Sequence, residues 1–184
     1  MARATALCAA LAAAAALAAC GGGDKVSGGD APTAAPRELT VTSPAFAANG
    51  AIPERFSCAG AGERPVLRFG GVPDGAVELA LLVIDPDAGG FVHWTVYGMA
   101  PGTRGLPATG LPAGVREGDS SRGEPGWTPP CPPEGSGTHR YRFELYWLRE
   151  RSGLDAGADP DDVVAAVRAG AGGRGELVGR FGRS

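Results

Sequence analysis

The sequence has little positive charge and few histidines, cysteines or aromatic residues. Lys+Arg 17 against Asp+Glu 20 give a formal net charge of −3, and the 184 residues include His 2, Cys 4 and 7% aromatic side chains. The missing positive charge argues against a nucleic-acid-binding protein that relies on a basic surface. No apolar run suits a polytopic membrane protein, and four cysteines do not make a small disulfide-rich scaffold. With 43% hydrophobic and 20% charged residues, the composition is that of one globular domain with a tail.

The first twenty residues predict an export signal. Residues 7–19 are uncharged and mostly alanine, a run too short to span a bilayer but suited to the apolar part of a secretory signal. The run ends in Leu17-Ala18-Ala19-Cys20-Gly21, which resembles the cleavage box of bacterial lipoproteins, where the cysteine becomes the lipid-modified first residue. An ordinary signal peptide or a buried helix is the alternative, but the glycine-rich stretch directly after Cys20 favours the lipoprotein.

The chain therefore divides into three predicted parts. Residues 1–19 are expected to be a lipoprotein signal peptide. Residues 20–36 are expected to hold the lipidated Cys20 and a flexible tether rich in glycine and proline. Residues 37–184 form the predicted domain. This organisation predicts an exported protein that a lipid anchors to a membrane of the cell envelope.

Two cysteines, Cys58 and Cys131, fall in the predicted domain. An exported compartment permits a disulfide between them. They are 73 residues apart, so the bond would stabilise the fold by about 4 kcal/mol in the chain-entropy model. Two unpaired thiols packed as small apolar groups are the alternative. The sequence leaves both possibilities open, because two cysteines alone fix no geometry.

Apolar patterning predicts a domain made mainly of strands. The expected strands cover residues 39–43, 67–69, 78–84, 91–97, 138–148 and 177–181. Six consecutive apolar residues at 79–84 favour a strand that is buried on both faces. Strict alternation along residues 91–97 predicts one face with Phe91, His93, Thr95 and Tyr97 and an opposite face with Val92, Trp94 and Val96.

A long connection and one late helix complete the predicted domain. Residues 98–137 are rich in glycine and proline and are expected to form a long loop, of a kind that is usually functional or disordered. Asp159 and Pro160 mark a helix start, and the helix is expected to end near Ala169. Strands first and one helix late favour a mainly β fold, a sandwich with a peripheral C-terminal helix, over a βαβ fold.

Three clusters of polar or rigid residues are candidates for a site, and all lie where a predicted strand ends or meets a loop. The residues are Asp85, Asp87, His93, Cys131, Pro132, Pro133, His139 and Tyr141. Taken singly, the clusters have plainer interpretations: a turn, a core histidine and a rigid loop that enters a strand. Taken together, two histidines and two acids are the material of a pocket for an anion or a metal ion.

Four motifs follow one another with a characteristic spacing. They are Leu81-Leu82-Val83-Ile84-Asp85-Pro86-Asp87-Ala88, Val92-His93-Trp94, Cys131-Pro132-Pro133 and His139-Arg140-Tyr141. This ordered set resembles the phosphatidylethanolamine-binding protein family, also called Raf kinase inhibitor-like proteins. Residues 52–60 and 176–181 are similar to the bacterial YbhB/YbcL-type branch. The resemblance covers residues 38–184. Each motif is weak alone, but the ordered set is specific.

The resemblance implies a PEBP-like β-sandwich with a small anion-binding pocket at one end. Carried over residue by residue, the ligand-binding set is the eight residues of the three clusters, from Asp85 to Tyr141. Two positions depart from the family pattern: Gly89 stands where a proline follows Asp-Pro-Asp-Ala, and Pro129 stands where a glycine precedes Pro-Cys-Pro-Pro. The resemblance implies no catalytic residue, no cofactor and no metal ion.

The expected function is non-enzymatic binding of a phosphorylated small molecule or a phospholipid headgroup. Asp85 or Asp87 is expected to accept a hydrogen bond from one imidazole nitrogen and to favour the charged ring. The other nitrogen would then donate to a phosphate oxygen, with the Tyr141 hydroxyl as a second donor.

Other functions have weaker support in the sequence. Members of the family also inhibit kinases or proteases, so an inhibitor or protein-interaction module acting through surface loops is the alternative, with its target unknown. A zinc enzyme lacks the usual ligand spacings. A serine hydrolase is unsupported at Ser120 and Ser121, because neither stands in a Gly-x-Ser-x-Gly motif.

Overall fold

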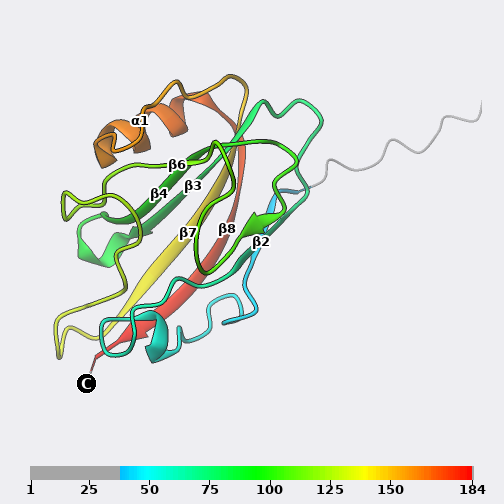
Figure 1. Ribbon diagram of the computed structural model, residues 1–184. Coiled ribbons are helices and arrows are strands. Elements are labelled where there is room, and N and C mark those ends of the chain that lie inside the picture. The colour runs from blue at the N-terminus through cyan, green and yellow to red at the C-terminus, as the bar shows by residue number, and fades with distance from the viewer. Residues whose placement is uncertain (1–37, 184) are drawn as a thin grey trace, which may run out of the picture. The chain divides into compact units, whose positions relative to one another are not determined.

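The computed structural model describes residues 38–183, which form a sandwich of two antiparallel sheets (Figure 1). The predicted signal peptide, Cys20 and tether lie outside the described residues. The smaller sheet has the order β1-β2-β5, with strands Thr40–Thr42, Leu67–Gly70 and Gly105–Leu106. The larger sheet has the order β6-β4-β3-β7-β8, with strands Arg116–Glu117, Phe91–Met99, Glu78–Asp85, Thr138–Leu148 and Ala171–Gly182. The mainly β fold predicted from the sequence is confirmed.

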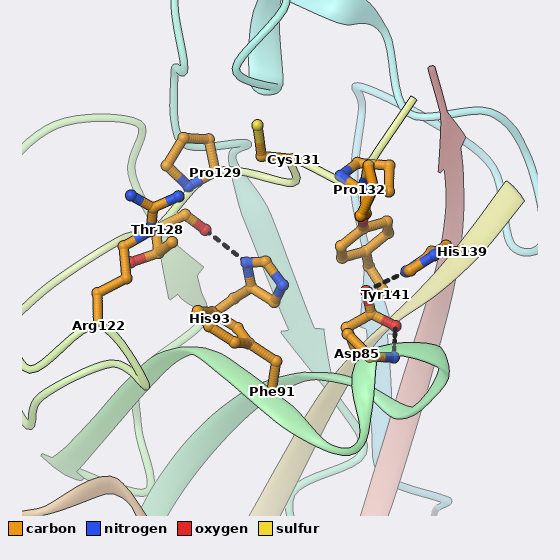
Figure 2. A pocket seen from close by; sticks show the side chains of 12 residues that line it. Asp85, Phe91, His93, Arg122, Thr128, Pro129, Cys131, Pro132, His139 and Tyr141 are labelled. Atoms are coloured by element: carbon orange, nitrogen blue, oxygen red, sulfur yellow. Dashed lines mark hydrogen bonds and ion pairs between the residues drawn. The ribbon is translucent and has the colours of Figure 1, made fainter. Parts of the chain in front are cut away.

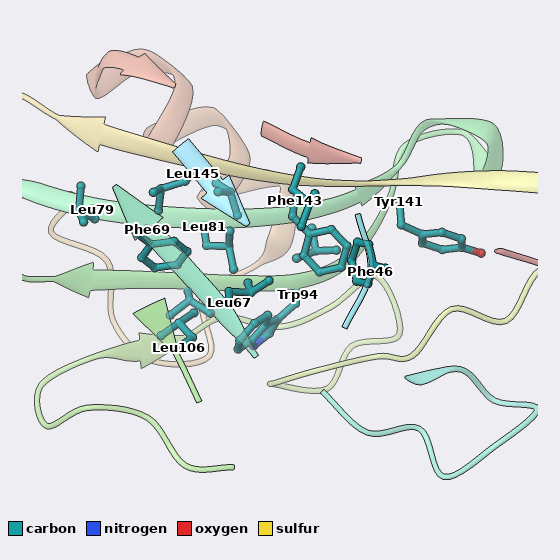
Figure 3. Close-up of a cluster of buried hydrophobic side chains, with 14 of the residues drawn as sticks. Phe46, Leu67, Phe69, Leu79, Leu81, Trp94, Leu106, Tyr141, Phe143 and Leu145 are labelled. Atoms are coloured by element: carbon teal, nitrogen blue, oxygen red, sulfur yellow. The ribbon is translucent and has the colours of Figure 1, made fainter. Parts of the chain in front are cut away.

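Strand β3 lies at the centre of the larger sheet and is buried along its whole length. Alternate side chains serve two cores. Leu79, Leu81 and Val83 point into the core between the sheets, which Figure 3 shows, whereas Ala80 and Leu82 face the opposite side. The prediction of a strand buried on both faces is therefore confirmed.

Helix α1, Pro160–Gly170, covers the second face of the larger sheet. It begins as predicted, with the Asp159 carboxylate accepting a hydrogen bond from the Asp161 amide and Pro160 in the first turn. Val163 and Val167 are buried against the sheet. None of the helices within residues 38–183 has the length and apolar character needed to cross a membrane.

Strand β4 does not alternate as the sequence predicted, because a bulge interrupts it at His93. Val83 pairs with Trp94, but the next residue, Ile84, pairs with Val92, so His93 is the extra residue on its strand. Val92 consequently packs with Tyr97 under helix α1 and does not share a face with Trp94. The predicted division of residues 91–97 into two faces is wrong for this reason.

Strand β8 is much longer than predicted, running over Ala171–Gly182 where the sequence predicted only residues 177–181. Its glycine-rich first half looks like a loop locally, yet it pairs with β7 over the same length. Glycine is required by close approach: a Cβ at Gly173 would meet the Trp147 indole, and one at Gly175 would collide with the Leu39 carbonyl.

The connection between β4 and β7, at residues 100–137, is long, as predicted, but hydrogen bonds hold it in place along its length. It contributes the short strands β5 and β6, and Asp119 forms an isolated bridge with Pro125. The Arg64 guanidinium donates hydrogen bonds to the Pro107 and Gly110 carbonyls of the same connection. This segment is therefore an ordered part of the sandwich and can hold side chains in place.

Candidate functional site

A small pocket lies at one end of the sandwich, where β3 ends and β4 and β7 begin (Figure 2). Its cavity has a volume of about 100 Å³. The lining residues come from the end of β3, the first residues of β4 and β7, and the connection before β7. The lining residues are Asp85, Ala88, Phe91, His93, Arg122, Thr128, Pro129, Cys131, Pro132, Pro133, His139 and Tyr141.

All but one of the predicted site residues line this pocket. The exception is Asp87, which lies in the short 3-10 helix Pro86–Ala88 and turns away toward Arg140. Its carboxylate accepts hydrogen bonds from the Arg140 amide at 2.8 Å and from the guanidinium at 3.0 Å and 2.6 Å. The Arg140 side chain lowers the pKa of Asp87 to about 2. Asp87 thus fixes the chain beside the pocket and does not line the cavity.

Asp85 is buried and orients His139. One carboxylate oxygen accepts the amides of Asp87 and Ala88, at 2.9 Å and 3.2 Å. The other oxygen lies 2.7 Å from His139 Nδ1. Because a carboxylate only accepts, Nδ1 of His139 carries the proton of this bond. On the far side of the ring, Nε2 lies 3.1 Å from the Ser136 hydroxyl. The expected pairing of an acid with an imidazole is therefore found at His139.

The second histidine, His93, pairs with a backbone carbonyl and not with an acid. Its Nδ1 lies 2.8 Å from the Thr128 carbonyl, and its own carbonyl accepts the Thr128 amide at 2.8 Å. Burial lowers the pKa of His93, although the Thr128 carbonyl and Asp85 act in the opposite direction. A carbonyl only accepts, so Nδ1 carries the proton, and in the neutral ring Nε2 is an acceptor. A backbone carbonyl therefore orients this ring, and burial favours its neutral form more than Asp85 favours the charged one.

Tyr141 brings a buried hydroxyl that has no partner. Its ring packs edge-on against His93, with ring centroids 5.1 Å apart. Figure 3 shows the ring at the border of the core cluster with its hydroxyl directed away from Phe143. This hydroxyl is fully buried and makes no hydrogen bond to any group of residues 38–183. Burial, and then the negative charge of Asp85, raise the pKa of Tyr141, so the hydroxyl keeps its proton as a donor.

The proline-rich wall of the pocket is held by a covalent bond. Cys58 and Cys131 form a disulfide with Cα atoms 5.3 Å apart. The Cys58 amide also donates to the Pro130 carbonyl at 3.0 Å. These bonds therefore hold Cys131 and Pro132 in the wall of the pocket (Figure 2), which Pro133 also lines.

Sequence reasoning missed several lining residues, above all Arg122 and Thr128. Thr128 acts through its backbone carbonyl, which leaves no signal in the side-chain pattern. Arg122 lies in a turn within residues 119–125, where Gly123 has a φ of 78°. The glycine after Arg122 is the one local feature of the sequence that indicates this turn. Within residues 38–183, no group of three or more His, Cys, Asp or Glu side chains has the arrangement of a metal site.

The fold and the pocket together define a small β-sandwich binding protein. The chain belongs to the phosphatidylethanolamine-binding protein family, whose sequence profile matches residues 42–182. The resemblance on which the sequence prediction rested is confirmed.

Relatives of known sequence or structure agree with this assignment. The candidate lipoprotein LppC of Mycobacterium tuberculosis is 42% identical over 188 aligned residues, which cover 94% of this chain and 93% of LppC. The crystal structure of the candidate PEBP homolog CT736 of Chlamydia trachomatis matches with a TM-score of 0.73 and 31% identity, over 80% of this chain and 99% of that one. YbcL of E. coli matches with a TM-score of 0.75 and 26% identity, over the same shares of the two chains.

Proposed function

We propose that this protein binds a phosphate group, carried by a small molecule or by a phospholipid headgroup, in the pocket between His93 and His139, and that it does so without chemical change of the ligand. The pocket supplies groups suited to phosphate: the Tyr141 hydroxyl as a donor, and His93 Nε2 as an acceptor from a protonated oxygen or, once protonated, as a second donor. Figure 2 shows Nε2 of His93 on the side of the ring that faces Tyr141 and Asp85.

The Tyr141 hydroxyl is the observation that carries the proposal. A buried polar group without a partner destabilises a fold by about 1–3 kcal/mol, so native proteins seldom keep one without a use. This hydroxyl is fully buried in the wall of a cavity and has no partner among the described residues. A ligand oxygen in the cavity would give it one.

The size of the cavity limits what it can hold. Pockets for drug-sized ligands measure about 300–1,000 Å³. At about 100 Å³, this one suits a phosphate and a short substituent but not an acyl chain. A phospholipid would therefore place only its headgroup here, with the rest of the lipid outside.

A membrane anchor fits this ligand class and is part of the proposal. The lipoprotein cleavage box at residues 17–21 lies outside the described residues, and the relative LppC, which bears the name of a candidate lipoprotein, supports it. Incorporation of an alkyne-tagged palmitate into the wild type but not into Cys20→Ser, in a bacterial host, is the expected result. Equal labelling of both would contradict the anchor.

A titration tests the binding proposal. The chain has only two histidines, so their ring signals in an NMR spectrum can be assigned with His93→Gln and His139→Gln. Addition of O-phosphoethanolamine to the wild type is expected to shift both signals together and saturably. Tyr141→Phe should weaken the binding by about tenfold, because it removes one hydrogen bond to a charged oxygen. Unmoved ring signals would overturn the proposal.

A serine hydrolase is the second candidate, and one observation favours it. The Ser136 hydroxyl, the His139 ring and the Asp85 carboxylate stand in the order of nucleophile, base and orienting acid, at 3.1 Å and 2.7 Å. Against it, the Ser136 hydroxyl donates to the Pro133 carbonyl at 2.8 Å, which explains its position as part of a turn. A fluorophosphonate probe is expected to leave Ser136 unlabelled. Labelling of the wild type but not of Ser136→Ala would establish the hydrolase instead.

A further inference from the structure

Arg122 is a cation of the pocket wall whose charge is not neutralised by a neighbour. Its side chain is exposed and lines the cavity, on the side of Thr128 and Pro129 (Figure 2). Within residues 38–183, no carboxylate lies at ion-pair distance from its guanidinium. By contrast, Arg140 beside the same pocket is paired with Asp87 at 2.6 Å.

The backbone around Arg122 is fixed against the strand that carries His93. The Ser121 amide donates to the Val92 carbonyl at 2.9 Å, and the Val92 amide donates to the Ser121 hydroxyl at 2.9 Å. The Arg122 amide donates to the Ser120 hydroxyl, which also accepts the Thr128 hydroxyl at 2.9 Å. These bonds place Arg122 next to the bulge at His93, so the fold positions its side chain at the pocket.

The other charged or titratable groups of the pocket are less suited than Arg122 to bind an anion. The Asp85 carboxylate is committed to three N–H donors, from His139, Asp87 and Ala88. Burial favours neutral His93, and the positive charge of Arg122 contributes to the lowering of the His93 pKa, so its field reaches the ring. Arg122 is therefore a permanent positive charge in the wall of this pocket without a carboxylate partner among residues 38–183.

Two features of a guanidinium decide which phosphate it prefers. Its planar N–H groups bind two oxygens of one phosphate side by side. A phosphate monoester offers three terminal oxygens and a charge of about −1.5 to −2 near pH 7. It can give two oxygens to Arg122 and the third to Tyr141. A phosphodiester offers only two terminal oxygens and one negative charge, so it cannot satisfy both residues fully.

We propose that Arg122 is the specificity-determining residue of this pocket, and that it selects a phosphate monoester over a phosphodiester. This inference rests on the proposed function, since it specifies the ligand of the same pocket. The monoester is the form of a free phosphorylated small molecule such as phosphoethanolamine, whereas the diester is the form of the phosphate that joins the glycerol and the headgroup alcohol of a phospholipid.

Calorimetric titration at pH 8 tests the inference with two probes, O-phosphoethanolamine as the monoester and glycerophosphoethanolamine as the diester. The wild type is expected to bind the monoester at least about tenfold more tightly, the value of one charge-assisted hydrogen bond at a partly exposed site. Arg122→Gln should lose about that factor for the monoester and much less for the diester. Arg122→Lys, which keeps the charge but not the fork, should fall between them. Arg151→Gln, a charge-matched control at an exposed position in the loop that follows β7, should match the wild type.

The outcomes separate this inference from the proposed function. Equal affinity of the wild type for the two probes, or an Arg122→Gln variant that retains full preference for the monoester, would overturn the role of Arg122 and leave phosphate binding in place. Failure of the wild type to bind either probe would overturn phosphate binding and the role of Arg122 together.

Discussion

Two buried carboxylates on neighbouring strands have opposite surroundings. Asp85, at the end of β3, is 2% exposed and faces a cavity. Glu144, in the middle of β7, is 1% exposed and is surrounded by cations. Its oxygens accept the Tyr146 hydroxyl at 2.7 Å and lie 2.9 Å and 3.2 Å from the guanidinium groups of Arg142 and Arg174, with a third, Arg168, at 3.7 Å.

The comparison separates a site that stabilises the fold from one that can bind. Around Glu144 the charges and hydroxyls are satisfied within the protein, so little is left for a ligand. Around Asp85 the carboxylate itself is satisfied, but the neighbouring Tyr141 hydroxyl has no partner and Arg122 has no counter-charge among the described residues. Groups left without a partner beside a cavity are typical of a binding site, and they support the proposed pocket.

The largest effect should come from opening the covalent wall of the pocket. The double variant Cys58→Ser/Cys131→Ser removes a cross-link between residues 73 apart, and its free energy of unfolding should fall by about 4 kcal/mol. Urea denaturation of the wild type, of the wild type with a reductant and of the variant measures this loss. The reduced wild type should match the variant. A loss below about 1 kcal/mol would contradict the role of the bond in closing the pocket end.

The next effect should come from the satisfied carboxylate. Glu144→Gln leaves three arginines around a neutral amide, and we expect the free energy of unfolding to fall by about 3 kcal/mol. Glu176→Gln is the matched control: Glu176 is partly exposed and pairs with Arg142, so its loss should change stability by less than about 1 kcal/mol. Phosphate binding by Glu144→Gln, measured well below its melting temperature, should equal that of the wild type. Weaker binding would show that the charge cluster around Glu144 and the pocket do not act independently.

Two tyrosines on β7 sharpen the comparison, with expected changes of about 1–2 kcal/mol in the free energy of unfolding. Tyr146→Phe removes a hydroxyl that is bonded to Glu144, so it should destabilise the fold by about 2 kcal/mol and leave ligand binding unchanged. Tyr141→Phe removes a hydroxyl without a partner, so it should raise stability by up to about 1 kcal/mol while it weakens phosphate binding. Thermal unfolding measures the stability of the two variants, and titration with O-phosphoethanolamine measures their ligand affinity. A Tyr141→Phe variant that is less stable than the wild type would contradict the unpartnered state of its hydroxyl.

Local pattern predicted those parts of the fold that local chemistry determines. The apolar run of β3 and the Asp159-Pro160 start of α1 were read correctly, because burial on both faces and helix capping depend on neighbouring residues. The length of β8 was missed, since its glycines are required by Trp147 and Leu39, which lie far away in the sequence.

The same division holds for the pocket. Motif order brought together its histidines, prolines and Asp85, and the structure places them around one cavity. The bulge that places His93 depends on how Val83 and Ile84 pair across the sheet, so alternation along one strand could not predict it. Arg122 was missed because its place depends on bonds between Ser121 and Val92, about thirty residues apart along the chain.

The smallest effect concerns the pH dependence of stability through His93. Burial holds the pKa of His93 below the ordinary value of about 6.5 that it has in the unfolded chain. Between these two pKa values the unfolded chain binds the extra proton first, so stability is complete above pH 6.5 and falls as the pH decreases. One proton limits the slope to about 1.4 kcal/mol per pH unit. Asp85, Arg122 and His139 face the ring and act on it together.

Urea denaturation between pH 7.5 and 5.5 measures this slope. We expect the wild type to lose stability toward pH 5.5 and His93→Gln to lose less, whereas His139→Gln should keep the decrease that is due to His93. Saturating O-phosphoethanolamine should reduce the loss in the wild type, because a bound phosphate favours the protonated ring of His93. A His93→Gln variant with the slope of the wild type would show that the pH dependence arises elsewhere. It would also show that the difference between the pocket and the charge cluster around Glu144 does not involve the titration of His93.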